Sequence, residues 1–462
     1  MRMPLLVLGL SLSTLPLLAG EGMPDDGIRT FTLENGLEAV VIEDHRTPAV
    51  THMMWYRVGA ADDPPGLSGL AHYLEHMMFK GTHNLAEGEF SRIVRENGGE
   101  ENAFTSYDYT GYFQRIAADR LELVMEMEAD RMANLAPPPA SAESELAVVM
   151  EERRQVVENR PGGIFNEERR AVQFINHPYG RPVIGWMHEL ENLVIDDFLA
   201  FHGEHYAPNN AILIVAGDVI VEEVEELARK HYGPIPDNPD LEPRQRTVIA
   251  PQQAARRVEY TDPRVQNPYV IRTYLAEPRR PGDQDEAAAL AVLAEVLGNG
   301  LTSVLAQELR VKEDFALDVG AYYGDLALDR TTFGVYVTPN PGVTLAEAEA
   351  RMDQVIADFL ATGVDPELLE RIKTRLRAAE IYARDNIGGR ARQIGAALTT
   401  GLDVEDVRAW PEALAAVTAE DVMAAAHEVF RPEASVTGWL RGTGEGVEPG
   451  EVVFDDTEVS GQ

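Results

Sequence analysis

The hydrophobic and polar positions of this chain follow two periods, which alternate along its first half. Stretches rich in β-branched and aromatic residues predict strands or hairpins at 31–41, 51–58, 102–116 and 211–215. Helical spacing between them predicts helices at 67–78, 89–96, 120–134 and 141–158. The first half is therefore expected to form a mixed or antiparallel sheet with helices packed on it.

A polar stretch with five prolines interrupts this pattern from 234 to 253 and is the best candidate for a domain boundary. Beyond it the order of elements repeats, with strands predicted at 267–275, 315–323 and 330–337 and helices at 284–297 and 302–311. The two halves thus resemble divergent copies of one α/β unit. The expected domains span 23–238 and 257–462, joined by a linker at 239–256.

The first 22 residues are typical of a targeting segment. Arg2 supplies a positive charge, 5–18 form an apolar run, and small residues follow at Ala19, Gly20 and Gly22. The run is shorter and more interrupted than a membrane-spanning helix requires. We expect a signal peptide at 1–22 and a periplasmic or secreted protein, with an uncleaved membrane anchor as the alternative.

Composition narrows the possible functions. The chain has 462 residues with 45% hydrophobic content, enough for two or more domains with sizeable cores. Its 77 acidic and 40 basic side chains give a formal net charge of −37, which repels the backbone of nucleic acids. Because the chain has no cysteine, it has no disulfide framework, and any metal site must use histidines and carboxylates.

The segment His72-Tyr73-Leu74-Glu75-His76 points to one particular chemistry. Positions four apart lie on one face of a helix, so both imidazoles can reach a single ion. Glu75 lies at the edge of that face, where its carboxylate can lean over the ion without binding it. This order, H-x-x-E-H, is the signature of the inverted zinc peptidases. Two ordinary packed histidines are the alternative interpretation.

A catalytic zinc ion commonly takes three protein ligands, leaves a position for water and lowers the pKa of that water to about 7. A nearby carboxylate can accept the water's proton and pass it to the leaving amine. The helix predicted at 141–158 offers Glu143, Glu145, Glu151 and Glu152 as a third ligand. Glu145 and Glu152 lie two turns apart on one face, so one can bind the ion while the other orients a histidine. The residues alone leave this choice open.

A second group of histidines has weaker spacing. In His202-Gly203-Glu204-His205 the histidines are three apart, a glycine lies inside the motif, and no carboxylate-bearing helix follows at a comparable distance. We interpret these as surface or packing histidines, and His83, His177 and His188, which stand alone, in the same way.

The chain resembles the pitrilysin and mitochondrial processing peptidase family of zinc peptidases from about Phe31 to Leu440. The matching segments are GLSGLAHYLEHMMFKGT (66–82), ENAFTSYDYTGYF (101–113), ELAVVMEERRQV (145–156) and YAPNNAILIVAGD (206–218). The resemblance implies an α+β fold of two homologous α/β domains that form a half-shell. It also implies that two such chains enclose a chamber for short or unfolded peptides.

Carried over residue by residue, the resemblance implies one zinc ion per chain, bound by His72, His76 and Glu152. It implies Glu75 as the general base and Glu145 as the carboxylate behind the metal.

The resemblance further implies that Asn102 and Ala103 bind the substrate backbone along an edge strand. Many members also carry, in the second domain, an arginine and a tyrosine seven residues apart that bind substrate near the scissile bond. Here Arg310 is present, but Leu317 stands where tyrosine is expected.

A leucine cannot donate a phenolic hydrogen bond to a developing oxyanion, and losing one such donor typically costs about 10²–10³ in rate. Similar bacterial enzymes that work as pairs suggest a heterodimer, in which a sister chain without zinc ligands supplies the Arg/Tyr pair. This chain would then be the catalytic subunit. The alternative is a homodimer that uses Tyr322 or Tyr323 instead.

The expected function is a secreted or periplasmic zinc endopeptidase. One alternative is an assembly subunit like the respiratory-complex core proteins that resemble this family, but those typically lose part of the metal motif. Another is a peptide-binding shell with incidental catalysis, which the Leu317 departure would permit.

Overall fold

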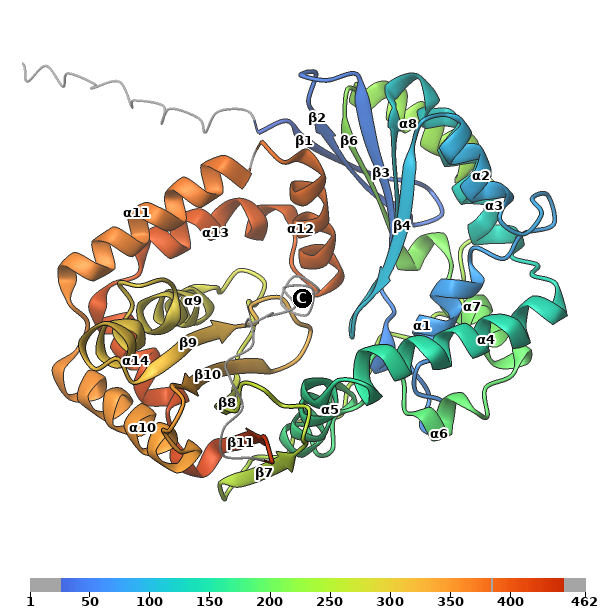
Figure 1. The fold of residues 1–462 in the computed structure, drawn as a ribbon. Helices are drawn as coiled ribbons and strands as arrows, with labels where there is room; N and C mark the ends of the chain where they lie inside the picture. The colour runs from blue at the N-terminus through green and yellow to red at the C-terminus, as the bar shows by residue number, and fades with distance from the viewer. Residues whose placement is uncertain (1–25, 384, 444–462) are drawn as a thin grey trace, which may run out of the picture.

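The computed structural model of the chain describes residues 26–383 and 385–443, so the expected signal peptide lies outside the described residues. Two halves, each built on one β-sheet with helices packed against it, make up this part of the chain (Figure 1). The arrangement confirms the expected fold class. None of the described helices combines the length and apolar character that crossing a bilayer requires.

The two sheets use the strands of one half each. The first sheet has the order β1-β2-β6-β3-β5-β4, and the second has the order β7-β11-β8-β10-β9. The strands of the first are β1 (Ile28–Thr32), β2 (Glu38–Glu43), β3 (Ala49–Tyr56), β4 (Glu100–Thr105), β5 (Thr110–Ala117) and β6 (Ala211–Gly217). Those of the second are β7 (Arg256–Thr261), β8 (Tyr269–Ala276), β9 (Ala316–Tyr323), β10 (Thr331–Pro339) and β11 (Ser435–Arg441).

Helices fill the intervals between the strands. Those of the first half are α1 (Leu70–Met77), α2 (Glu89–Glu96), α3 (Leu121–Asn134), α4 (Pro139–Arg153), α5 (Pro161–Gln173), α6 (Met187–Leu190), α7 (Ile195–His205) and α8 (Val221–His231). Those of the second half are α9 (Asp285–Gly298), α10 (Leu345–Thr362), α11 (Pro366–Ala383), α12 (Ile387–Thr399), α13 (Val404–Ala416) and α14 (Ala419–Val429).

The two sheets share one topology once β1 is set aside. The order β2-β6-β3-β5-β4 in the first sheet corresponds place by place to β7-β11-β8-β10-β9 in the second. In each, the first two strands of this order are parallel and the later neighbours are antiparallel. The helix α1 follows β3, and α9 follows the equivalent strand β8, but α9 contains no histidine. The predicted repeat of elements is confirmed, and the H-x-x-E-H motif belongs to the first half.

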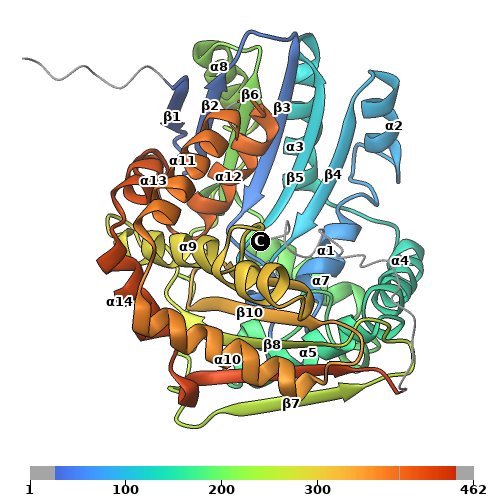
Figure 2. The same ribbon diagram turned by 60° about the vertical axis from the view of Figure 1, so that its left-hand side comes forward.

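Each half also covers a sheet face of the other half (Figure 2). One face of the first sheet packs on α1, α3, α7 and α8, and its opposite face is covered by α12 from the second half. In return, α5 from the first half lies on the second sheet, where Phe165 packs against Ile271 and Leu440. A Cβ atom at Gly438 would come within 2.5 Å of the Phe165 ring, so this close approach requires glycine. The exchanged helices join the two halves into one folded unit.

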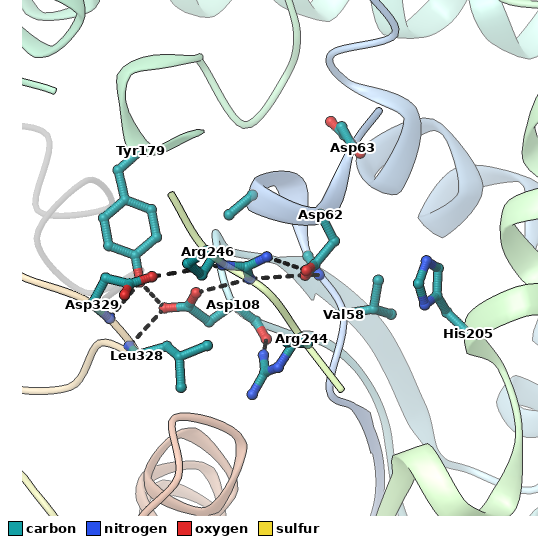
Figure 3. A network of polar contacts seen from close by, with 12 residues as sticks. Val58, Asp62, Asp63, Asp108, Tyr179, His205, Arg244, Arg246, Leu328 and Asp329 are labelled. Atoms are coloured by element: carbon teal, nitrogen blue, oxygen red, sulfur yellow. Dashed lines mark hydrogen bonds and ion pairs between the residues drawn. The ribbon is translucent and has the colours of Figure 1, made fainter. Parts of the chain in front are cut away.

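Between α8 and β7 the chain forms no helix or strand, yet it is fixed to both halves by charge (Figure 3). Arg246 lies between Asp62 and Asp108 of the first half and Asp329 of the second. Arg244 donates to two backbone carbonyls, one from each half. Because buried charges are costly unless paired, this network favours one relative position of the halves. The domain limits at 238 and 257 stay a prediction.

Candidate metal centre

The helix α1 is held in place at its first turn and along its buried face. Asp63, almost fully buried, accepts hydrogen bonds from the backbone N–H groups of Gly69 at 2.7 Å and Ala71 at 2.8 Å. These groups belong to the N–H donors that a helix start leaves without a partner. Burial raises the pKa of Asp63 to about 8, although these two bonds act in the opposite direction. Leu74 anchors the helix in the hydrophobic core.

Two histidines of α1 and one glutamate of α4 converge on a single point. The Nε2 atoms of His72 and His76 lie 3.9 and 3.4 Å from Oε2 of Glu152. All three ligand atoms lie within 4.8 Å of one another, and no other group of this kind occurs among the described residues. A tetrahedral zinc ion with bonds of 2.0–2.2 Å separates its ligands by about 3.4 Å. The donor set therefore suits zinc, and the shortest of these distances, between His76 and Glu152, equals this separation.

The charges of the three groups also favour a cation between them. Burial lowers the pKa of His72 to about 4, so this imidazole is neutral. Burial alone would lower the pKa of His76 too, but hydrogen bonds with Glu145 and Glu152 outweigh burial and raise it to about 9. The same contact with His76 lowers the pKa of Glu152. A negatively charged Glu152 beside a neutral His72 favours a cation between the three groups.

The structure distinguishes the positions of the two candidate glutamates. Glu152 approaches both imidazoles, whereas Glu145 contacts only His76, with Oε1 2.8 Å from Nδ1. The other oxygen of Glu145 lies 2.6 Å from Nζ of Lys80. An Nδ1–H bond to a carboxylate fixes the imidazole and leaves Nε2 free to bind an ion. The remaining candidates, Glu143 and Glu151, are exposed.

Replacing Glu145 by Gln is expected to lower the affinity for zinc by about 10–100-fold, because His76 loses the charge that orients it. Competition with a chromophoric chelator measures this affinity. Glu143→Gln, on an exposed position of the same helix, is the matched control and should leave affinity unchanged. Equal affinities of the E145Q variant and the unaltered protein would contradict the orienting role.

Glu75 lies beside this group without joining it. Its side chain is 9% exposed, and Oε2 accepts a hydrogen bond of 2.6 Å from Oγ1 of Thr105. Burial raises the pKa of Glu75 to about 7, a value suited to both accepting and releasing a proton. Thr105 was not singled out by the sequence, although it follows Asn102 and Ala103 in one of the matching segments. Spacing alone gives no sign of its contact with Glu75.

Asn102 and Ala103 lie on β4, one of the two edge strands of the first sheet. β4 pairs with β5 on one side only, and α1 contacts it. Alternation along the strand places Ala103 and Thr105 on the side of α1, and Asn102 and Phe104 on the side of α12. The free edge of β4 offers backbone groups that an extended peptide can pair with, next to Glu75.

Arg310 lies apart from these residues. It belongs to a short π-helical segment, Ala306–Lys312, and its guanidinium lies 3.5 Å from the carboxylate of Asp318 on β9. Among the described residues, no hydrogen bond or ion pair joins Arg310 to the zinc-binding group. Leu317 precedes Asp318 on the same strand. Within one chain, the structure does not bring Arg310 to the candidate metal centre.

The two tyrosines considered as substitutes for the missing phenol are both held in the second half. The hydroxyl of Tyr323 donates to the backbone carbonyl of Glu277. The Tyr322 ring lies so close over Gly334 that a Cβ atom there would be 2.3 Å from it. Neither contact points to the metal centre of the same chain.

The second group of histidines serves packing, as expected. His202 stacks on Tyr206 with ring centroids 5.1 Å apart, and His205 meets Phe201 edge to face at 4.5 Å. They are not part of any metal-binding group among the described residues.

Known proteins and protein families are similar to this chain over most of its length. Residues 39–186 match the family model described as insulinase (peptidase family M16), and residues 192–376 match that of the peptidase M16 inactive domain. The zinc protease PqqE of Helicobacter pylori is 30% identical over 417 residues, which cover 89% of this chain and 92% of that protein. The second match falls mainly on the half that lacks the H-x-x-E-H motif.

Solved structures agree with these matches. The crystal structure of a protease from Helicobacter pylori has a TM-score of 0.84 and 28% identity, covering 90% of this chain and 99% of that one. The first half of the periplasmic protease PqqL from Escherichia coli has a TM-score of 0.78 at 19% identity, with 91% and 92% covered. The latter identity supports a shared fold only.

Proposed function

Because the chain belongs to peptidase family M16, the pitrilysin and insulinase family, we propose that it is a zinc-dependent endopeptidase acting on short or unfolded peptides. The observation that carries this proposal is the convergence of His72, His76 and Glu152, with the carboxylate of Glu75 beside them. Similar proteins are named zinc proteases, which supports zinc as the metal.

In the proposed mechanism, His72, His76 and Glu152 hold the zinc ion. When bound, zinc supplies Lewis acidity that lowers the pKa of water and polarises a peptide carbonyl. Glu75 accepts the proton of the attacking water and delivers it to the leaving amine nitrogen. The hydroxyl of Thr105 holds one oxygen of Glu75, which leaves the other for proton transfer.

The edge strand β4 positions the substrate in this mechanism. An extended peptide that pairs with its free edge lies alongside α1, where Glu75 reaches the scissile bond. Holding the reacting groups in this geometry removes much of the entropic cost of bringing them together.

Removal of the metal tests the proposal. The zinc-loaded protein, with its partner where one is required, is expected to cleave a quenched fluorescent peptide. Treatment with a chelator should lower the rate by at least about 10²-fold, and equimolar zinc should restore it. Cleavage that persists in metal-free protein would contradict the proposal, as would a failure of the zinc-loaded assembly to cleave any peptide in a broad library.

We also propose that a homologous chain without zinc ligands completes the site in a heterodimeric chamber. Leu317 lacks the phenol that many family members supply, and Arg310 is bound to Asp318 in its own half. Measuring cleavage by this chain alone, and after addition of a sister chain that carries the Arg/Tyr pair, tests this. Full activity of the chain alone would contradict the heterodimer and favour the homodimer.

We also propose that the protein is exported to the periplasm or secreted. The charged and apolar pattern of residues 1–22 supports it, and PqqL of Escherichia coli, which has a similar fold, is described as periplasmic.

A further inference from the structure

The sheet face that α12 covers carries an exposed row of side chains at its β4 edge. α12 packs on β3 and β6, while β5 and β4 continue beyond these strands. Glu100 and Asn102 of β4 are exposed, and Phe104 is half-buried. Along this part of the face the cross-strand pairs are Glu100 with Arg115, Asn102 with Phe113, and Phe104 with Gly111.

One side chain of α12 reaches over this row. The guanidinium carbon of Arg392 lies 4.3 Å from the centre of the Phe104 ring and 5.4 Å from that of Phe113. Arg392 is exposed, and no carboxylate among the described residues forms an ion pair with it. Arg115 on the same face, by contrast, is paired with Glu100 at 3.8 Å.

The surroundings of Arg392 leave its positive charge available to bind an anion. Partial burial lowers the pKa of its guanidinium, and the electrostatic influence of Tyr109, which acts in the opposite direction, is too small to offset the loss of water. A guanidinium stacked on an aromatic ring still presents N–H groups at its edge, in a geometry that matches a carboxylate. Arg392 therefore has the chemistry of an anion-binding group, and no carboxylate of residues 26–383 or 385–443 is paired with it.

A peptide paired with β4 would place alternate side chains on the two faces of the sheet. One set would lie with Ala103 and Thr105, on the side of Glu75. The other set would lie with Asn102 and Phe104, beneath Arg392. A shift of one residue would move every side chain to the opposite face.

We propose that Arg392 is a specificity-determining residue that binds a carboxylate of the peptide on the face of β4 opposite Glu75. The inference rests on the proposed peptidase function and extends it to substrate choice and register. In a protein with a net charge of −37, most of the surface repels acidic peptides, so one unpaired arginine beside the edge strand gives a local preference.

Peptide binding to the zinc-loaded Glu75→Gln variant tests the proposal without the need for cleavage. A fluorescent peptide is made in two series, in which a single Glu or a single Gln moves along an otherwise uncharged sequence. The Glu peptide is expected to bind about 10-fold more tightly than its Gln counterpart at one position and not at the positions next to it. Raising the salt concentration should reduce this preference.

Substitutions at Arg392 identify the group responsible. Arg392→Met keeps an apolar side chain over Phe104 and should abolish the preference for Glu, and Arg392→Glu should favour Lys at the same position. Arg392→Lys should retain part of the preference. Arg377→Met removes one charge from an exposed position of α11 and is the matched control that should keep it. Zinc content verifies that each variant is folded.

Two further outcomes are informative. Amidation of the peptide C-terminus distinguishes a side-chain carboxylate from a terminal one, and either source supports the proposal if Arg392→Met removes its effect. Equal binding of Glu and Gln peptides at all positions, or a preference that survives Arg392→Met, would overturn it while leaving the peptidase function intact. Absence of binding by any peptide would contradict both.

Discussion

Replacing Glu75 by Gln is expected to lower the kcat/KM for peptide cleavage by at least about 10²-fold while one zinc ion per chain is retained. The amide of Gln cannot accept the proton of the attacking water. Its oxygen can still receive the hydrogen bond from Thr105, so the fold around the site should be preserved. Cleavage of a quenched fluorescent peptide gives the rate, and elemental analysis gives the zinc content.

The control for this substitution is Glu151→Gln, an exposed position of α4 whose carboxylate contacts Arg154. It should leave both rate and zinc content unchanged. If Glu75→Gln had no effect on function, the alternatives of an assembly subunit or a peptide-binding shell would replace the peptidase interpretation.

The second large effect is expected from His76→Ala, which removes both a ligand atom and the partner of Glu145. The affinity for zinc should fall by more than the roughly 10–100-fold expected for Glu145→Gln, and cleavage should be lost with it. Zinc retained after gel filtration is the measurement. His188→Asn, at a histidine whose side chain is 77% exposed, is the matched control. Retention of one zinc ion by the H76A variant would show that His76 is not a ligand.

Much of the metal centre is encoded locally and was predictable from the sequence. His72, Glu75 and His76 lie within five residues, so helical spacing alone places both imidazoles on one face. The repeated order of strands and helices likewise predicted two related sheets, because neighbouring elements usually pack together. These predictions depend on contacts between residues or elements that are close together in the sequence.

Contacts between segments that lie far apart in the sequence were harder to predict. Glu145 and Glu152 share a helix face, and only the position of α4 relative to α1 decides which glutamate approaches both histidines. The hydroxyl of Thr105 and the guanidinium of Arg392 are placed by β4 and α12, which the sequence does not orient. The apolar face of a helix predicts that the helix is buried, but it does not identify the sheet on which the helix packs. The packing of α5 and α12 on the sheet of the opposite half was therefore not predictable from the sequence.

Anomalous diffraction at the zinc absorption edge, on crystals of the purified protein, most directly tests whether this chain binds a catalytic metal. One peak per chain is expected, within bonding distance of His72 Nε2, His76 Nε2 and a carboxylate oxygen of Glu152. A chain that shows no peak after incubation with zinc, or a peak bound by other residues, would contradict the assignment.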